Sequence, residues 1–330
     1  MFLFKLHSIS ILLTISGATA AIAQYKTKPL ITSDKSQFGP SIEGTGVDKA
    51  GNIYAVNYGD ATSLATLGQV TPQRLFYEDK VTQGTAFNGI RFSRGNKTVA
   101  YTVDYINHRV VELTVNGPTI SSRNHCSSPD FLQPNDLALS KSGYIYLSGM
   151  KWQSNGQVGD GDLWVCSPSG VPKRLDLLGR TNGIELSPDD KYLYLSEANN
   201  QNGTPISNKI WRYKIDPNTG NVSNKFLFFD FAKLQSQSVD IDGMRTDISG
   251  NLFVTRNGGQ QVVKLSRSGK VLAIIKTSFS SITNLEFGGT RGKTLHIVGK
   301  CTDNSPNGEV VGCVDTWENN VPGRAWSILQ

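Results

Sequence analysis

A sequence phrase that occurs six times constrains the fold of this chain more than any other feature. Each copy has a polar residue, usually followed by Gly, near the start of an apolar segment, and a turn and a second apolar segment follow. The copies begin at Glu43-Gly44, Asn88-Gly89, Asn135-Asp136, Asn182-Gly183, Asp242-Gly243 and Asn284-Leu285. They start 42 to 60 residues apart, a spacing typical of β-propeller blades and not of helical repeats.

The remainder of each copy also has the alternation of β-strands. Third strands are expected at residues such as 109–113 and 162–165, and a fourth is visible in several copies, as at 271–275. We therefore predict an all-β fold, a six-bladed β-propeller of four-stranded antiparallel blades, as one domain over residues 24–330. An end of the chain should complete the last blade, either near residues 28–32 or near residues 324–329, and the sequence does not decide between them.

Residues 1–23 are expected to be a secretory signal peptide. They combine Lys5 near the start, an apolar stretch from about Ile9, and the small-residue motif Ala21-Ile22-Ala23. The alternative is a membrane anchor, although the apolar stretch is shorter than the roughly 20 residues that a spanning helix needs. We expect a secreted, extracellular protein with no membrane association after cleavage.

The net charge and the glycosylation sequons bear on the expected partner and modification of the chain. The chain has 33 Lys+Arg against 27 Asp+Glu, and a net charge of +6 that is scattered along the sequence does not predict nucleic-acid binding. Sequons begin at Asn96, Asn202 and Asn221, so export predicts a glycoprotein. We expect a monomer whose partner is a small molecule.

Four cysteines remain, and an even number in an exported chain favours disulfides. Cys301 ends a second strand and Cys313 lies in the third strand of the same blade, so antiparallel pairing should bring them together. Cys126 and Cys166 would then pair by elimination. The alternative is four buried free thiols.

The six polar residues should form one ring, because the innermost strand of each blade borders the central channel. The ring would hold two carboxylates and four amides, whose oxygens suit a hard divalent cation, above all Ca²⁺, although other divalent cations are possible. The alternative is that Asn-Gly and Asp-Gly are only common tight-turn dipeptides.

These phrases resemble the senescence marker protein/gluconolactonase-like family of calcium-dependent sugar lactone lactonases. The residues that carry the resemblance are Ile42-Glu43-Gly44, Pro134-Asn135-Asp136-Leu137-Ala138, Thr181-Asn182-Gly183-Ile184, Asp242-Gly243-Met244 and Thr283-Asn284-Leu285-Glu286-Phe287-Gly288-Gly289. The resemblance implies that Glu43, Asn182 and Asp242 hold the metal. It implies that Asn135 is a further contact to metal or substrate.

One position departs from the family pattern. Sugar-lactone members often carry an Arg two residues before the blade-three Asn, and here Gln133 stands there, which makes a strongly anionic sugar acid less expected. Arg245 or Arg256 could replace the missing charge, and the alternative is that both arginines have a surface or inter-blade role. Substrate contacts are expected from Gln133, Arg245 and three ring amides: Asn88, Asn135 and Asn284.

The resemblance implies a secreted calcium-dependent hydrolase that opens a small lactone or ester by metal-assisted attack of water in the central channel. Asp242 is the first candidate to position or deprotonate that water, and Asp136 is the second. Two alternatives stay open, namely an organophosphate or fluorophosphate hydrolase that uses the same ring, and a secreted binding propeller without catalysis.

Overall fold

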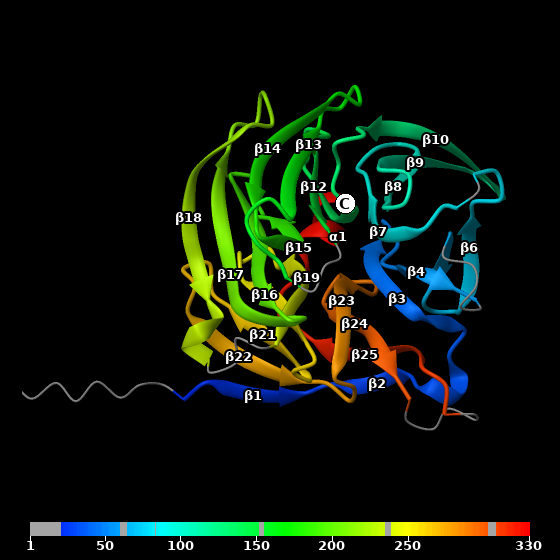
Figure 1. The fold of residues 1–330 in the computed structure, drawn as a ribbon. Coiled ribbons are helices and arrows are strands. Elements are labelled where there is room, and N and C mark those ends of the chain that lie inside the picture. The colour runs from blue at the N-terminus through cyan, green and yellow to red at the C-terminus, as the bar shows by residue number, and fades with distance from the viewer. Residues whose placement is uncertain (1–20, 60–64, 83, 152–154, 235–238, 303–307) are drawn as a thin grey trace, which may run out of the picture.

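The computed structural model describes residues 21–59, 65–82, 84–151, 155–234, 239–302 and 308–330. Six antiparallel sheets are arranged around a central axis, as Figure 1 shows, so the prediction of an all-β six-bladed propeller is confirmed. No helix in these ranges is long and apolar enough to cross a membrane.

The blades follow one another along the chain, and within each blade the first strand is innermost. Blade one consists of β3 (Phe38–Val47), β4 (Ile53–Tyr58), β5 (Thr66–Gln69) and β6 (Arg74–Glu78). Blade two consists of β7 (Phe87–Phe92), β8 (Thr98–Asp104), β9 (Arg109–Asn116) and β10 (Thr119–Ser127). Blade three consists of β11 (Pro134–Leu139), β12 (Ile145–Met150), β13 (Gly161–Cys166) and β14 (Pro172–Leu178). Blades four and five are β15 (Arg180–Leu186), β16 (Tyr192–Gln201), β17 (Thr204–Ile215) and β18 (Val222–Asp230); and β19 (Asp240–Thr246), β20 (Leu252–Asn257), β21 (Gln261–Leu265) and β22 (Val271–Lys276).

Blade six is completed by the start of the chain. Its strands β23 (Ser281–Gly288), β24 (Thr294–Cys301) and β25 (Val311–Glu318) come from the C-terminal part, and β2 (Lys28–Ile31) pairs antiparallel with β25. Of the two chain ends considered from the sequence, the N-terminal one therefore closes the ring. Residues 324–329 instead contain the short helix α1 (Arg324–Ile328).

The N-terminal segment also adds a strand that the sequence pattern does not predict. Strand β1 (Ala23–Lys26) pairs in parallel with β22, so blade five has five strands. The chain start thus crosses from blade five to blade six. Besides α1, the described chain has two short 3-10 helices, η1 (Ser33–Lys35) and η2 (Phe231–Leu234). Ala23, the last residue of the expected signal peptide, is the first residue of β1.

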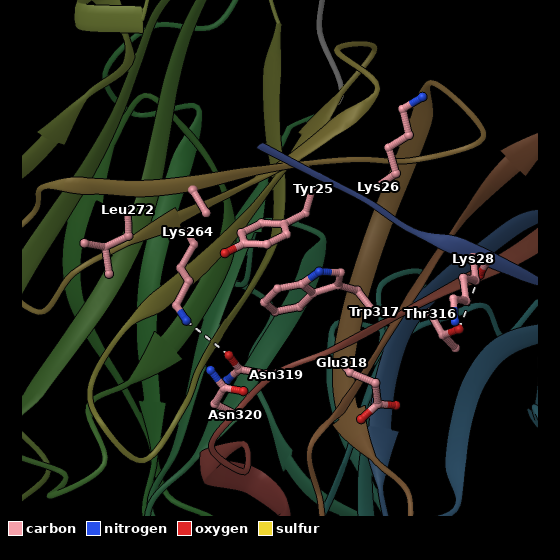
Figure 2. Close-up of a pocket in the computed structure, with 11 residues that line it drawn as sticks. Tyr25, Lys26, Lys28, Lys264, Leu272, Thr316, Trp317, Glu318, Asn319 and Asn320 are labelled. Carbon is pink, nitrogen blue, oxygen red and sulfur yellow. Dashed lines mark hydrogen bonds between the residues drawn. The ribbon is translucent and has the colours of Figure 1, made fainter. Parts of the chain in front are cut away.

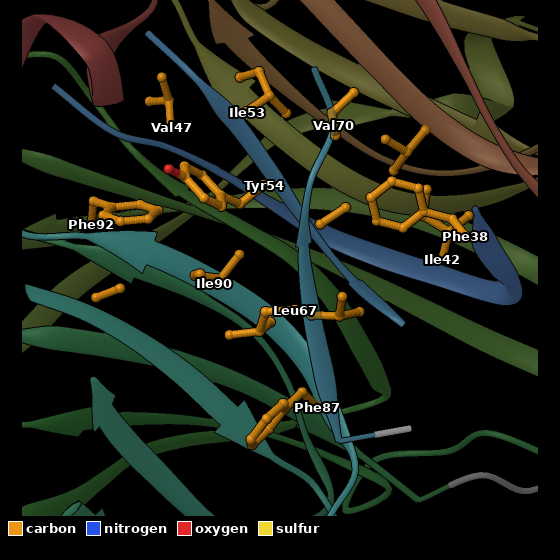
Figure 3. Close-up of a cluster of buried hydrophobic side chains, with 14 of the residues drawn as sticks. Phe38, Ile42, Val47, Ile53, Tyr54, Leu67, Val70, Phe87, Ile90 and Phe92 are labelled. Carbon is orange, nitrogen blue, oxygen red and sulfur yellow. The ribbon is translucent and has the colours of Figure 1, made fainter. Parts of the chain in front are cut away.

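The hydrophobic core lies between neighbouring blades. Inner strands such as β11 are buried along their whole length, whereas the outer strand β10 is mostly exposed. Figure 3 shows one such core between blades one and two, where the Tyr54 and Phe92 rings lie 4.8 Å apart between centroids and Leu67, Phe87 and Ile90 are fully buried. Burial of apolar surface at about 25 cal/mol per Å² makes these contacts between blades the main stabilisation of the ring.

Both expected disulfides are present. Cys301 and Cys313 join β24 to β25 with their Cα atoms 6.0 Å apart, and this bridge lies within blade six. Cys126 and Cys166 have Cα atoms 6.2 Å apart and join β10 of blade two to β13 of blade three. The second bridge therefore ties two neighbouring blades together.

Candidate functional site at the open end of the channel

Every ring residue lies on the innermost strand of its blade, next to an irregularity in strand pairing. The register shifts at Glu43, Asn182 and Asp242, and it also shifts at the ring positions of the other three blades. A β-bulge adds one residue to a strand and re-aims the side chains beside it. The bulges therefore let polar side chains turn toward the channel while the rest of each strand packs in the core.

The Gly residues after the ring residues have a packing role. Gly183 lies inside β15, and a Cβ there would meet the Asp242 backbone oxygen of the next blade at 2.2 Å. Gly243 lies inside β19, and a Cβ there would meet the Asn284 Oδ1 atom at 2.4 Å. Asn182-Gly183 and Asp242-Gly243 therefore lie inside strands, and the alternative that they are only tight-turn dipeptides is wrong. The missing side chain of each Gly lets the ring residue of the next blade approach its backbone closely.

A pocket of about 250 Å³ opens where blades one, two, three and six converge. It is lined by Ser41, Glu43, Asn57, Asn88, Tyr105, Gln133, Pro134, Asn135 and Lys300. Four residues expected from the sequence, Glu43, Asn88, Gln133 and Asn135, are among them. Lys300 was not predicted.

Glu43 and Asp242 form the acidic part of the site. Burial raises the pKa of Glu43 well above its usual value, and the negative charge of Asp242 raises it further. Burial likewise raises the pKa of Asp242 to about 7, against the opposing effect of the Asn257 and Asn182 amides. Glu43, Asn182 and Asp242 come from blades one, four and five, and the close packing of Gly183 against the Asp242 backbone oxygen brings blades four and five together at the ring.

The Asp242 carboxylate is only half satisfied. Its Oδ2 atom accepts a hydrogen bond of 2.9 Å from Asn257 Nδ2, whereas its buried Oδ1 atom has no hydrogen-bond partner within the described residues. Asn57 Oδ1, in the pocket wall, is also buried and unpartnered there. Unsatisfied buried oxygens of this kind favour a bound cation or an ordered water.

The donor set fits a hard divalent cation. Glu43 and Asp242 supply two negative charges, and Asn135 and Asn182 supply amide oxygens, which are the ligand types that Ca²⁺ prefers. No group of three or more His, Cys, Asp or Glu side chains in the described ranges is placed to hold a metal ion. A cation here would therefore need amide oxygens in addition to the two carboxylates.

Three expected site residues lie deeper, below the pocket. Asp136, Asn284 and Arg245 are 1%, 1% and 0% exposed. Arg245 contacts Glu286 at 2.9 Å and Asp136 at 3.4 Å, and it donates to Asn284 Oδ1 at 2.9 Å. A catalytic role of Asp136 and substrate contacts of Asn284 and Arg245 would require these side chains to reach the pocket surface. The structure instead buries all three below it.

These side chains belong to a buried ion-pair network, which we define as Arg91, Asp136, Glu185, Arg245, Glu286 and Arg324. Arg91 contacts Asp136 at 3.0 Å, and Arg324 contacts Glu185 at 3.5 Å. Arg324 belongs to α1, which occupies the centre of the ring in Figure 1, and it also donates to the backbone oxygens of Ser187 and Leu139. The C-terminal helix thus closes the channel at the end opposite the pocket.

Arg256, the other arginine considered from the sequence, is also away from the pocket. It is 1% exposed and stacks on the Phe231 ring, with 3.7 Å between the guanidinium carbon and the ring centroid. Its position in a packed contact between blades leaves Lys300 as the cation that lines the described part of the pocket.

A second cleft, of about 570 Å³, lies on the outer strands of blades five and six (Figure 2). Tyr25 and Trp317 have ring centroids 5.4 Å apart there, and Lys264 Nζ donates to Asn319 Oδ1 at 3.1 Å. None of its lining residues is a ring residue. We therefore take the channel pocket as the candidate site.

Two curated proteins are similar to this chain in sequence. The chain is 34% identical over 182 residues to a gluconolactonase of Zymomonas mobilis, which is 51% of this chain and 48% of that protein. It is 28% identical over 143 residues to regucalcin of Xenopus laevis, or 43% of this chain and 44% of that protein. The chain therefore spans less than half the length of these curated relatives.

Solved structures share the fold. A luciferin-regenerating enzyme superposes with a TM-score of 0.69 at 19% identity, over 90% of this chain and 96% of that chain. The calcium-binding protein regucalcin of Agrobacterium tumefaciens gives 0.69 at 15% identity, over 92% and 97%. A gluconolactonase of Xanthomonas campestris gives 0.61 at 16% identity, over 94% and 99%.

A family model decides the assignment. The model of the SMP-30/gluconolactonase/LRE-like region matches residues 119–299, which is more than half of the chain and includes the inner strands of blades three to six. The expected resemblance is confirmed, and this chain belongs to the SMP-30/gluconolactonase/LRE-like family.

Proposed function

We propose that this protein hydrolyses a small lactone and depends on a bound divalent cation, Ca²⁺ first among them. One observation carries the proposal: two carboxylates, the half-buried Glu43 and the buried Asp242, lie close together at the open end of the channel, and Asp242 Oδ1 has no hydrogen-bond partner within the described residues. Buried charge without compensation is costly, so a cation is the simplest reason for this arrangement. Glu43, Asn135, Asn182 and Asp242 would hold it.

The reaction needs water to attack the lactone carbonyl carbon. A bound Ca²⁺ would polarise that carbonyl and stabilise the negative charge that develops on its oxygen. Asp242 would position the attacking water and accept its proton as a general base. The acyl–oxygen bond of the ring then breaks, and the ring oxygen takes the proton back from Asp242 and becomes a hydroxyl group of the same hydroxy-acid product.

The pocket wall suits a polyhydroxylated ring. Asn88, Gln133 and Asn135 offer both donors and acceptors, and Ser41 and Tyr105 add hydroxyl groups. The volume of about 250 Å³ favours a small substrate over a polymer. α1 closes the far end of the channel, so substrate and product would use the same entrance.

We also propose that the protein is exported and acts outside the cell as a monomer. Two disulfides support an oxidising compartment, and the expected signal sequence over residues 1–23 supports export. Asn96 and Asn202, two of the three sequon residues, are exposed, as glycosylation requires. Mass spectrometry of the mature chain from the native secretome would test cleavage and glycosylation together.

The activity test uses the purified mature protein and a panel of aldonolactones and other small lactones. Acid release should appear with Ca²⁺, disappear with a chelator and return when Ca²⁺ is added again. Ca²⁺ at 100 times its dissociation constant should also stabilise the folded protein by about 2.7 kcal/mol. Organophosphate and fluorophosphate substrates in the same panel distinguish the competing hydrolase, and bound calcium without turnover on any substrate would favour a binding propeller.

A further inference from the structure

Lys300 brings a positive charge to the pocket from blade six. It lies near the end of β24, one residue before Cys301, and it lines the pocket together with Glu43. Its charge acts on Glu43, since it lowers the pKa of that carboxyl against the larger effect of burial. Lys300 is exposed, and it makes no ion pair with any residue in the described ranges.

The backbone around Lys300 is held firmly against blade one. Lys300 pairs with Ser281 on one side and with Gly312 on the other, and the Cys301–Cys313 bridge follows directly. Gly312 is packed so closely that a Cβ there would meet Ile42 Cβ at 2.8 Å. Because Ile42 directly precedes Glu43, this packing fixes the start of the Lys300 side chain beside the ring.

The charges of the pocket do not balance around Lys300 once a divalent cation binds. Glu43 and Asp242 carry two negative charges, which the cation cancels. Apart from Glu43 and Lys300, the described lining residues are Ser41, Asn57, Asn88, Tyr105, Gln133, Pro134 and Asn135, all of which are neutral near pH 7, and Asp242 lies beside Glu43 without lining the pocket. The loaded pocket is therefore left with one positive charge at its mouth, which suits a ligand that carries an anionic group.

We propose that Lys300 determines specificity by binding a carboxylate that the substrate carries away from its reacting carbonyl. The inference rests on the proposed lactonase function and names its substrate class as sugar lactones with a second, ionised carboxyl group. Gln133 leaves blade three without a charge, and Arg245 and Arg256 are buried away from the pocket. Lys300 supplies from blade six the positive charge that those positions do not supply.

The experiment compares two lactones of the same ring size, one neutral aldonolactone and one aldarolactone with a free carboxylate. The variant Lys300→Met keeps most of the side-chain length and removes the charge, Lys300→Arg keeps the charge, and Lys270→Met is a matched control in the exposed turn between β21 and β22. At saturating Ca²⁺, the ratio of kcat/KM for the anionic lactone to kcat/KM for the neutral lactone should fall about tenfold in Lys300→Met, as expected for loss of a hydrogen bond to a charged group.

Lys300→Arg and Lys270→Met should keep the preference of the unchanged protein. The preference should also weaken as salt is raised, because the pair is accessible to solvent. An equal effect of Lys300→Met on both lactones, or none on either, would overturn the inference and leave the lactonase function intact.

A binding measurement separates this inference from the proposed function. If the protein hydrolyses no lactone at all, the proposed function fails, and calorimetric titration with the dicarboxylate product of the aldarolactone still tests Lys300. About tenfold weaker binding to Lys300→Met than to the unchanged protein would support carboxylate recognition. Equal binding to both would reject it.

Discussion

The two ends of the central channel hold the same kinds of charged group in opposite arrangements. At the open end, the half-buried Glu43 and the buried Asp242 lie close to each other, and the Asp242 Oδ1 atom has no hydrogen-bond partner in the described chain. At the closed end, the acids of the buried ion-pair network each contact an arginine, as Asp136 does with both Arg91 and Arg245. One end therefore balances its own charge, and the other requires a ligand to do so.

The two arrangements are built from the same strands. Asp242 and Arg245 are three residues apart in β19, and Asn182 and Glu185 are three residues apart in β15. In a regular strand, residues three apart face opposite sides, and the bulge beside each ring residue removes that restriction. Each of these strands therefore carries a ring residue and a member of the buried ion-pair network. The network can stabilise the fold while the ring keeps a carboxylate oxygen without a hydrogen bond, available to a ligand.

The largest effect is expected at the closed end. Arg245→Met should lower the free energy of unfolding by about 3–5 kcal/mol, because it leaves buried carboxylates without their partner. Asp136 and Glu286 both lose an ion-pair contact, and Asn284 Oδ1 loses a donor. Urea unfolding measures the loss, with Lys270→Met as the exposed control, and a stability within about 1 kcal/mol of the unchanged protein would contradict the structural role of the network.

The opposite result is expected at the open end. Asp242→Asn should reduce kcat/KM for a lactone about 100-fold or more, because stabilisation of transition-state charge is worth several kcal/mol. Without calcium the variant should be at least as stable as the unchanged protein, since an ionised carboxylate with a raised pKa costs stability above that pKa and the amide removes this cost. Steady-state kinetics measures the loss of activity, and urea unfolding of the same preparation measures the stability without calcium. Full activity together with a lower free energy of unfolding would mean that Asp242 stabilises the fold and does not serve catalysis.

The arrangement of blades could be predicted because it repeats. The recurring polar residue and the second apolar strand mark the inner half of each blade, and the neighbouring-strand positions of Cys301 and Cys313 were enough to anticipate that bridge, from which the Cys126–Cys166 bridge followed by elimination. Strand β1 could not be predicted in the same way, because it is four residues long and each of its residues pairs with a residue of β22 that is 250 positions away. Its place depends on tertiary contacts that leave no local pattern.

The candidate site was only partly predictable for a related reason. The ring residues share a local motif, whereas the buried ion-pair network joins residues as distant as Asp136 and Arg245, 109 positions apart. A signal did exist, because a charged residue follows the ring residue by two or three positions in four inner strands: Arg91, Glu185, Arg245 and Glu286. Lys300 has no such repeat and becomes a pocket residue only through the packing of blade six against blade one.

The smallest effect is expected from Asn257, which contacts the open end only through Asp242. Its Nδ2 atom donates to Asp242 Oδ2 at 2.9 Å and so fixes the direction of the unpartnered Oδ1 atom. Asn257→Ala should weaken Ca²⁺ binding by about tenfold, as loss of a group that orients a metal ligand commonly does. Calorimetric titration with Ca²⁺ measures this change, and Asn257→Asp tests whether an acceptor at this position is worse than no side chain. Unchanged affinity in Asn257→Ala would mean that Asp242 is oriented by its backbone alone, and the bulge in β19 would then carry the whole geometry of the ring.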